Sequence, residues 1–307
     1  MRLYKFFSGN EHHVDALEKY SVWFSEPDKF NDPFEGIYHT SIKKVEDLNE
    51  VLSLVKLLHE SKLFKYEGGS FDVNDILIPL YASESFREQF WQRIEKTSSD
   101  AVKRIQQNFY NSGVACFLSA KEKKRKEKKI DPLMNSLMWG HYGNGLRGFA
   151  TVLNDGGNAY NKLDFFESKD ISSLKVNYKD KPAVVDTLEL MTYLFKQNKI
   201  HVEDDIVRLV HSFSGNESDP ANMMLSMLHT KSNEWEYENE TRFICEKGAG
   251  LRKYKDGVVK EIIVGEKMPS DMKGEIKEIA NKHNILSIKE AFVSSRNYNI
   301  QIRDYRG

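Results

Sequence analysis

Hydrophobic residues recur at intervals of three and four positions over residues 44–66 and 84–111. In the first stretch, the hydrophobic positions are Leu48, Val51, Leu52, Val55 and Leu58. Side chains spaced in this way share one side of an α-helix, which can then be buried against a core. The pattern therefore predicts a helical insertion over about residues 44–111.

Short runs of β-branched and aromatic residues flank this insertion and predict strands. They cover residues 2–7, 21–25, 114–119, 148–153, 174–178, 240–245, 258–264 and 285–293. Further helices are expected over residues 10–20, 184–198, 201–213, 270–283 and from 223 to 229 toward Trp235. The last strand, helix and strand are typical of a βαβ unit. Strand-rich ends around a helix-rich middle favour a single α+β domain over residues 1–307, with a central mixed or antiparallel sheet surrounded by helices.

The charge balance narrows the classes of partner. The 307 residues carry 45 lysines and arginines against 46 aspartates and glutamates, so no global field attracts the chain to nucleic acid or membrane. The two cysteines, Cys116 and Cys245, form no CxxC pair and indicate free thiols in a reducing compartment. There is no signal core after the N-terminus and no window of roughly 20 apolar residues. We therefore expect a cytoplasmic protein without a membrane span.

One local exception to this balance is the run Lys121–Lys129, in which seven of nine residues are basic. Such a run is usually a solvated loop. The alternative is a contact with the phosphates of a nucleic acid. The run contains no aromatic residues, so stacking on bases is not indicated.

The first candidate for chemistry is the segment Trp235-Glu236-Tyr237-Glu238-Asn239-Glu240-Thr241-Arg242. On a strand, Glu238 and Glu240 would point to the same face. Two parallel carboxylates repel each other, so such a face needs cations or substrate donors opposite them. The alternative is a solvated strand on which Arg242 is their partner.

The second candidate is Phe30-Asn31-Asp32-Pro33-Phe34-Glu35, which lies in a loop that Pro27, Pro33 and Gly36 make an ordered turn. Asn31 and Asp32 either point toward a ligand or bond their own backbone in an Asx-turn. The third candidate is His141 in Trp139-Gly140-His141-Tyr142, either a general acid or base or a structural residue beside aromatic rings.

Several common sites are not indicated by the sequence. The histidines show no HxH or HExxH spacing, so we assign no metal. There is also no GxGxxG, P-loop or GxSxG motif.

Seven clusters stand in a characteristic order along the chain. They are Leu3-Tyr4-Lys5, Phe24-Ser25-x-Pro27, Phe30-Asn31-Asp32-Pro33-Phe34-Glu35, Cys116-Phe117-x-Ser119, Met138-Trp139-x-His141-Tyr142 with Gly148-Phe149, Trp235-x-Tyr237-Glu238-x-Glu240-x-Arg242, and Ile262-Ile263-x-Gly265. Their order resembles family 2971 of the domains of unknown function, found in bacteria and often near mobile or defence genes. The basic insert at 121–129 and the lack of an acidic residue after Ser119 depart from its pattern. The family implies no settled function.

A weaker resemblance is to ADP-ribosyltransferases, which use a basic residue on the first strand, a serine on the second and an ExE motif on a later one. The matching positions are Lys5, Ser25 and the pair Glu238 and Glu240. The resemblance implies NAD as a substrate, with the cation and the serine fixing its pyrophosphate and ribose. Glu240 would stabilise the charge that develops as nicotinamide leaves. Lys5 stands where arginine or histidine is usual, and about 200 residues separate Ser25 from the glutamates.

Three hypotheses follow from these residues. The first is transfer of ADP-ribose, or NAD cleavage, by an effector of phage defence or a toxin system that acts on a protein or nucleic-acid target. Its catalytic candidates are Glu240, Glu238 and His141, and its NAD-binding candidates are Lys5, Ser25, Tyr142, Asn31, Asp32 and Arg242. The second is a metal-dependent nuclease using Asp32, Glu35, Glu238 and Glu240. The third is a non-catalytic binding module of a defence complex.

Overall fold

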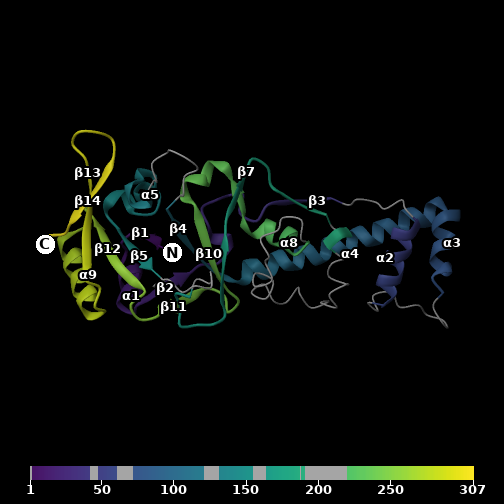
Figure 1. Cartoon of the computed structure of the whole chain (residues 1–307), viewed down its shortest axis with the longest axis horizontal. Helices are drawn as coiled ribbons and strands as arrows, with labels where there is room; N and C mark the ends of the chain where they lie inside the picture. The colour runs from purple at the N-terminus through teal and green to yellow at the C-terminus, as the bar shows by residue number, and fades with distance from the viewer. Residues whose placement is uncertain are drawn as a thin grey trace. The chain divides into compact units, whose positions relative to one another are not determined.

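A computed structural model describes most of the chain (Figure 1). The described residues are 2–41, 48–60, 72–120, 131–154, 164–186, 188–190 and 220–307. The chain forms two compact units. The first comprises Met1–Phe30, Ser112–Tyr178 and Asn233–Gly307, and the second comprises Asn31–Asn111 and Lys179–Ser232. The helical insertion expected from the sequence belongs to the second unit.

An eight-stranded sheet forms the centre of the first unit, in the order β14-β13-β12-β5-β1-β4-β10-β6. Its strands are β1 (Arg2–Phe7), β4 (Gly113–Ser119), β5 (Phe149–Asn154), β6 (Ile171–Lys175), β10 (Glu240–Cys245), β12 (Val259–Gly265), β13 (Ser287–Val293) and β14 (Ile300–Asp304). β12 and β13 run parallel, and the other neighbours run antiparallel. The predicted α+β class with a mixed central sheet is confirmed.

Alternation along β1 shows how the sheet separates two cores. Leu3 and Phe7 join one hydrophobic cluster, whereas Tyr4 and Phe6 join another. Because successive side chains of a strand point to opposite faces, these clusters lie on opposite sides of the sheet. Helices α1 (Glu11–Glu18) and α9 (Ser270–Lys282) contribute to the first cluster, and α5 (Ser136–His141) contributes to the second.

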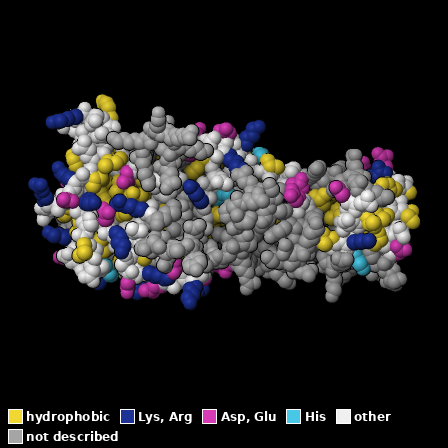
Figure 2. All heavy atoms as spheres, viewed as in Figure 1, with side chains coloured by type: hydrophobic (Ala, Val, Ile, Leu, Met, Phe, Trp, Pro, Cys, Tyr) yellow, Lys and Arg dark blue, Asp and Glu magenta, His cyan; other side chains and the backbone are white. Residues whose placement is uncertain are grey.

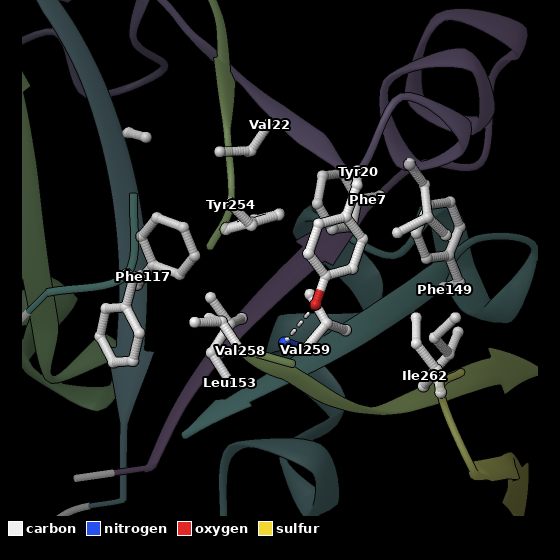
Figure 3. Packing of buried hydrophobic residues seen from close by; sticks show 14 of the residues in the cluster. Phe7, Tyr20, Val22, Phe117, Phe149, Leu153, Tyr254, Val258, Val259 and Ile262 are labelled. Atoms are coloured by element: carbon white, nitrogen blue, oxygen red, sulfur yellow. Dashed lines mark hydrogen bonds between the residues drawn. The ribbon is translucent and has the colours of Figure 1, made fainter. Parts of the chain in front are cut away.

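Figure 3 shows the packing of the first cluster around Tyr20. The rings of Phe7 and Phe149, which are opposite each other on β1 and β5, stack at 4.7 Å. The hydroxyl of Tyr20 accepts a hydrogen bond from the backbone N–H of Val259 at 3.1 Å. A polar group is therefore satisfied inside an otherwise apolar layer.

The predicted βαβ unit is present as β12, α9 and β13, with the two strands parallel. Glu290 on β13 accepts a hydrogen bond from Lys273 of α9 at 2.8 Å. Arg303 on β14 donates to the other oxygen of Glu290 from Nε at 2.8 Å. This ion-pair network ties the helix and the edge strand to β13.

The first unit also holds a two-stranded sheet of β2 (Ser21–Phe24) and β11 (Gly250–Lys253). A short 3-10 helix, η1 (Pro27–Lys29), follows β2. Two further 3-10 helices, η2 (Pro132–Met134) and η3 (Asn144–Leu146), flank α5. The loop that the sequence predicts after Pro27 begins with η1 and continues as hydrogen-bonded turns, with Glu35 N donating to Asp32 O at 3.2 Å.

The second unit is mainly helical. Its helices are α2 (Leu48–Glu60), α3 (Asn74–Ala82), α4 (Glu84–Asn111) and α8 (Pro220–His229). Strand β3 (Tyr38–Ser41) pairs in parallel with β8 (Ala183–Asp186). Val51, Leu80 and Trp91 belong to the core that joins α2, α3 and α4, as the helical spacing of the sequence predicted.

Some elements differ from the prediction. The helix expected from residue 184 is wrong at its start, because Val184 and Val185 are β-branched and lie in β8 beside β3. Helix α8 ends at His229, and β9 (Thr230–Ser232) follows it instead of a helix toward Trp235. The strand expected at 174–178 divides into β6 and β7 (Asn177–Lys179). The helix expected at 201–213 and the basic run 121–129 lie outside the described residues.

The described surface carries charges of both signs. On the face in Figure 2, lysine and arginine side chains are interspersed with aspartate and glutamate. Ion pairs between side chains of the first unit include Arg2–Glu261 at 2.7 Å and Lys282–Glu18 at 3.1 Å. Within the described ranges, no helix combines the length and the apolar character needed to cross a bilayer.

Candidate functional site

Glu238 and Glu240 are both buried, at 2% and 1% exposure, but they belong to different elements. Glu238 ends the 3-10 helix η5 (Asn233–Glu238), and Glu240 begins β10. The strand predicted over residues 240–245 is confirmed as β10, and Glu238 precedes it, so the two acids do not share a strand face. Asn239 between them has a φ of +45°, which interrupts the extended backbone.

Glu240 is held on the face of the sheet by groups from β10 and from the segment after β6. Arg242 donates from Nε to Glu240 Oε1 at 2.9 Å, and its side chain is fully buried. The hydroxyl of Tyr178 accepts the backbone N–H of Glu240 at 2.8 Å. Burial raises the pKa of Tyr178, and the negative charge of Glu240 raises it further, so Tyr178 is a neutral hydroxyl here.

Cys116 on β4 stands opposite Arg242 in the strand register. Burial raises the pKa of the Cys116 thiol, and the charge of Glu240 raises it further. Arg242 and Lys5 act in the opposite direction but do not outweigh these effects. Cys116 is therefore a protonated thiol beside the Glu240 carboxylate, not a thiolate nucleophile.

Glu238 receives a hydrogen bond from the hydroxyl of Tyr142, with 2.5 Å between Tyr142 Oη and Glu238 Oε1. Tyr142 directly follows α5, whose start is capped by Asn135 accepting the backbone N–H of Leu137 at 3.0 Å. Tyr142, which follows His141 in the sequence, thus brings its hydroxyl to Glu238. Tyr142 is a partner of a glutamate in this structure.

His141 itself is exposed at the end of α5. Its ring lies 6.3 Å from the rings of Trp235 and of Tyr142, between centroids. The structure places it in an aromatic group beside the Tyr142–Glu238 contact.

The sheet opens between β1 and β4. The two strands pair through Leu3–Ser119 and Tyr4–Leu118, whereas β1 and β5 pair along the whole of β1. Beyond this point the ammonium of Lys5 donates to the backbone carbonyl of Cys116 at 3.0 Å. Burial lowers the pKa of Lys5, and Cys116 and Glu240 partly offset that effect.

Ser25 approaches β4 from the end of β2. It forms an antiparallel bridge with Val114, with Ser25 N donating to Val114 O at 2.9 Å and Val114 N donating to Ser25 O at 2.8 Å. Lys5 thus contacts β4 through its ammonium, Ser25 through its backbone and Glu240 through strand pairing, at three alternate residues of β4. These residues are Cys116, Val114 and Leu118, respectively.

Asn31 and Asp32 belong to the second unit. Asp32 is buried and accepts the backbone N–H of Phe34 at 3.0 Å, so it forms the Asx-turn that the sequence left open as an alternative. Its neighbour Phe30 belongs to the first unit, where its ring centre is 5.9 Å from the guanidinium carbon of Arg242. Over the described ranges, no three His, Cys, Asp or Glu side chains are grouped so as to hold a metal ion.

Residues 138–243 match the family model described as protein of unknown function DUF2971. The match supports the family indicated by the motifs over this segment. The DUF2971 match covers Tyr142, Glu238, Glu240 and Arg242, whereas Lys5 and Ser25 precede it. No curated protein and no solved structure matches the chain.

Within the DUF2971 segment, sequence reasoning missed two residues of the site. No sequence motif indicated Tyr178, because its contact with Glu240 depends on the pairing of β6 with β10. Asn239 was recognisable as a candidate turn residue, because asparagine tolerates a left-handed backbone better than most residues. Its place between two acids could have indicated a turn instead of a continuous strand.

Proposed function

We propose that this protein is an ADP-ribosyltransferase-like enzyme that cleaves NAD and transfers ADP-ribose to a macromolecular target. The observation that carries the proposal is that Lys5, Ser25 and Glu240 all reach β4: Lys5 through its ammonium, Ser25 through its backbone and Glu240 through strand pairing. These are the cation, the hydroxyl and the acid at the positions of the ADP-ribosyltransferase resemblance. Its setting in phage defence or a toxin system is an expectation from the family resemblance.

Each group has a chemical role in this reaction. The ammonium of Lys5 and the hydroxyl of Ser25 would hold the anionic pyrophosphate and the ribose of NAD. The bond between ribose C1′ and the nicotinamide nitrogen breaks, and its electron pair leaves with neutral nicotinamide. The carboxylate of Glu240 would stabilise the positive charge left on the ribose. Glu238, oriented by Tyr142, would take the proton that the attacking nucleophile loses.

Nicotinamide release by the purified full chain tests the proposal, together with transfer of labelled ADP-ribose to proteins and nucleic acids of a bacterial lysate. Wild-type protein is expected to release nicotinamide, and Glu240→Gln is expected to lose at least about 100-fold in rate. Glu290→Gln is the matched control, because Glu290 is also a buried, ion-paired acid of the same sheet. It is expected to keep the wild-type rate.

Two results would remove the proposal. One is a wild type as silent as Glu240→Gln with every candidate target. The other is an equal loss of rate in Glu240→Gln and Glu290→Gln, because the loss would then reflect folding.

The burial of the Glu240–Arg242 pair favours a second candidate, a non-catalytic binding module. A fully buried ion pair can serve to specify the packing of a sheet without touching a substrate. In that case Glu240→Gln leaves binding of the defence-complex partner intact, whereas changes of exposed residues abolish it. Co-purification of partners with Glu240→Gln and wild type from the native host separates the two candidates.

A further inference from the structure

Asn239 has an unusual backbone conformation between the two glutamates. Its φ of +45° lies in the left-handed region, which asparagine enters more readily than most residues. Its backbone N–H donates to Glu236 O at 3.3 Å and closes the helix that Glu238 ends. The chain therefore changes direction at Asn239 before β10 begins at Glu240.

The side chain and carbonyl of Asn239 are bonded to Ser119, the last residue of β4. Asn239 Nδ2 donates to Ser119 O at 2.9 Å and to Ser119 Oγ at 2.7 Å. Asn239 O accepts from Ser119 N and from Ser119 Oγ, both at 3.1 Å. Four hydrogen bonds thus hold the turn at the point where β10 starts to pair with β4.

This geometry explains how two acids from different elements become buried together. With the left-handed residue between them, Glu238 at the end of η5 and Glu240 at the start of β10 are both buried, although they do not share a strand. We infer that Asn239 is a positioning residue, clamped by Ser119, which sets the orientation of both glutamates for the NAD chemistry. The inference rests on the proposed function and adds a residue that touches neither substrate nor reacting atoms.

The kinetic test compares three substitutions with one control. Asn239→Ala removes the amide and disfavours the left-handed backbone, whereas Asn239→Gly removes only the amide. Ser119→Ala removes the hydroxyl of the clamp. The control is Asn284→Ala, because Asn284 after α9 also has a positive φ, +54°, away from the two glutamates.

We expect kcat for nicotinamide release to fall about 100-fold in Asn239→Ala, with KM for NAD changed much less. Asn239→Gly and Ser119→Ala should lose less, and Asn284→Ala should keep the wild-type kcat. A misplaced catalytic group lowers kcat, whereas general destabilisation affects the control as well.

Alkylation of Cys116 provides a second measurement that does not depend on NAD. The thiol lies beside Glu240, so a displaced glutamate should raise its rate of alkylation relative to that in Asn284→Ala. Mass spectrometry follows it separately from the buried Cys245. A wild type that releases no nicotinamide removes the proposed function and with it the catalytic part of the inference, while alkylation still shows whether the clamp holds Glu240.

Two outcomes overturn the clamp itself. In the first, Asn239→Ala has the same kcat and the same rate of Cys116 alkylation as wild type. The second is equal effects in Asn239→Ala and Asn284→Ala.

Discussion

Arg242 and Glu240 form an ion pair inside the first unit, with 2.9 Å between Arg242 Nε and Glu240 Oε1. The two side chains are only 0% and 2% exposed. Two charges without access to water depend on each other, because each offsets the desolvation cost of the other. The pair therefore links the stability of the sheet to the chemistry proposed for Glu240.

We predict that Arg242→Met strongly destabilises the protein. It leaves Glu240 as a buried charge without its guanidinium partner, which costs about 3–5 kcal/mol in the free energy of unfolding. The double variant Arg242→Met with Glu240→Gln should recover part of this loss. Urea unfolding of both single variants and the double variant measures the coupling, and purely additive losses would contradict it.

A second prediction concerns the close approach of β1 to the start of β5. A Cβ on Gly148 would lie 1.9 Å from the carbonyl oxygen of Phe7, so Gly148→Ala must displace backbone. We expect a loss of about 1–3 kcal/mol in the free energy of unfolding. Gly140→Ala is the control, because no atom lies within 4 Å of its added Cβ and alanine favours helix α5. Thermal unfolding that gave the two variants equal midpoints would show the prediction to be wrong.

The third prediction contrasts two buried tyrosines. The hydroxyl of Tyr254 is buried near that of Thr151 without a well-formed hydrogen bond among the described residues, whereas that of Tyr20 accepts from Val259 N. Tyr254→Phe should keep or raise stability, because it removes a desolvated polar group. Tyr20→Phe should lose about 1 kcal/mol, since the N–H of Val259 loses its partner. Urea unfolding of both variants measures the difference, and a larger loss in Tyr254→Phe would contradict the assignment.

The fourth prediction is a dependence of stability on pH that arises from Glu290. Burial raises the pKa of Glu290, but hydrogen bonds and charges from Lys273 and Arg303 outweigh it and hold the pKa below its ordinary value. A depressed pKa in the folded state means that this carboxylate stabilises the fold above its unfolded pKa of about 4.3. The contribution is lost as pH falls through the folded pKa.

Urea unfolding between pH 7 and pH 3 should therefore show a smaller acid-induced loss for Glu290→Gln than for wild type. Glu261→Gln serves as a comparison, because Glu261 is a more exposed acid that also pairs with a lysine and an arginine. Parallel curves for wild type and Glu290→Gln would rule out this source of acid sensitivity.

Much of the fold was predictable because its signals are local. The spacing of Leu48, Val51 and Val55 indicates a helix within a few residues, and the short aromatic run up to Phe7 indicates a strand. The order of strand, helix and strand near the C-terminus is enough to predict a parallel pair. The misassigned helix at 184 shows the limit, because the pairing of β8 with β3 decided the conformation of Val184.

For the site, the sequence by itself determined the residue types and their order: a lysine and a serine, followed by two glutamates and an arginine inside the segment that matches DUF2971. Only the tertiary structure decided which of them meet. Lys5 reaches the carbonyl of Cys116 across 111 positions of the chain, and Glu240 bonds the hydroxyl of Tyr178 across 62. Contacts of this kind depend on strand register and on the left-handed turn at Asn239, which bring together groups that have no local relationship in the sequence.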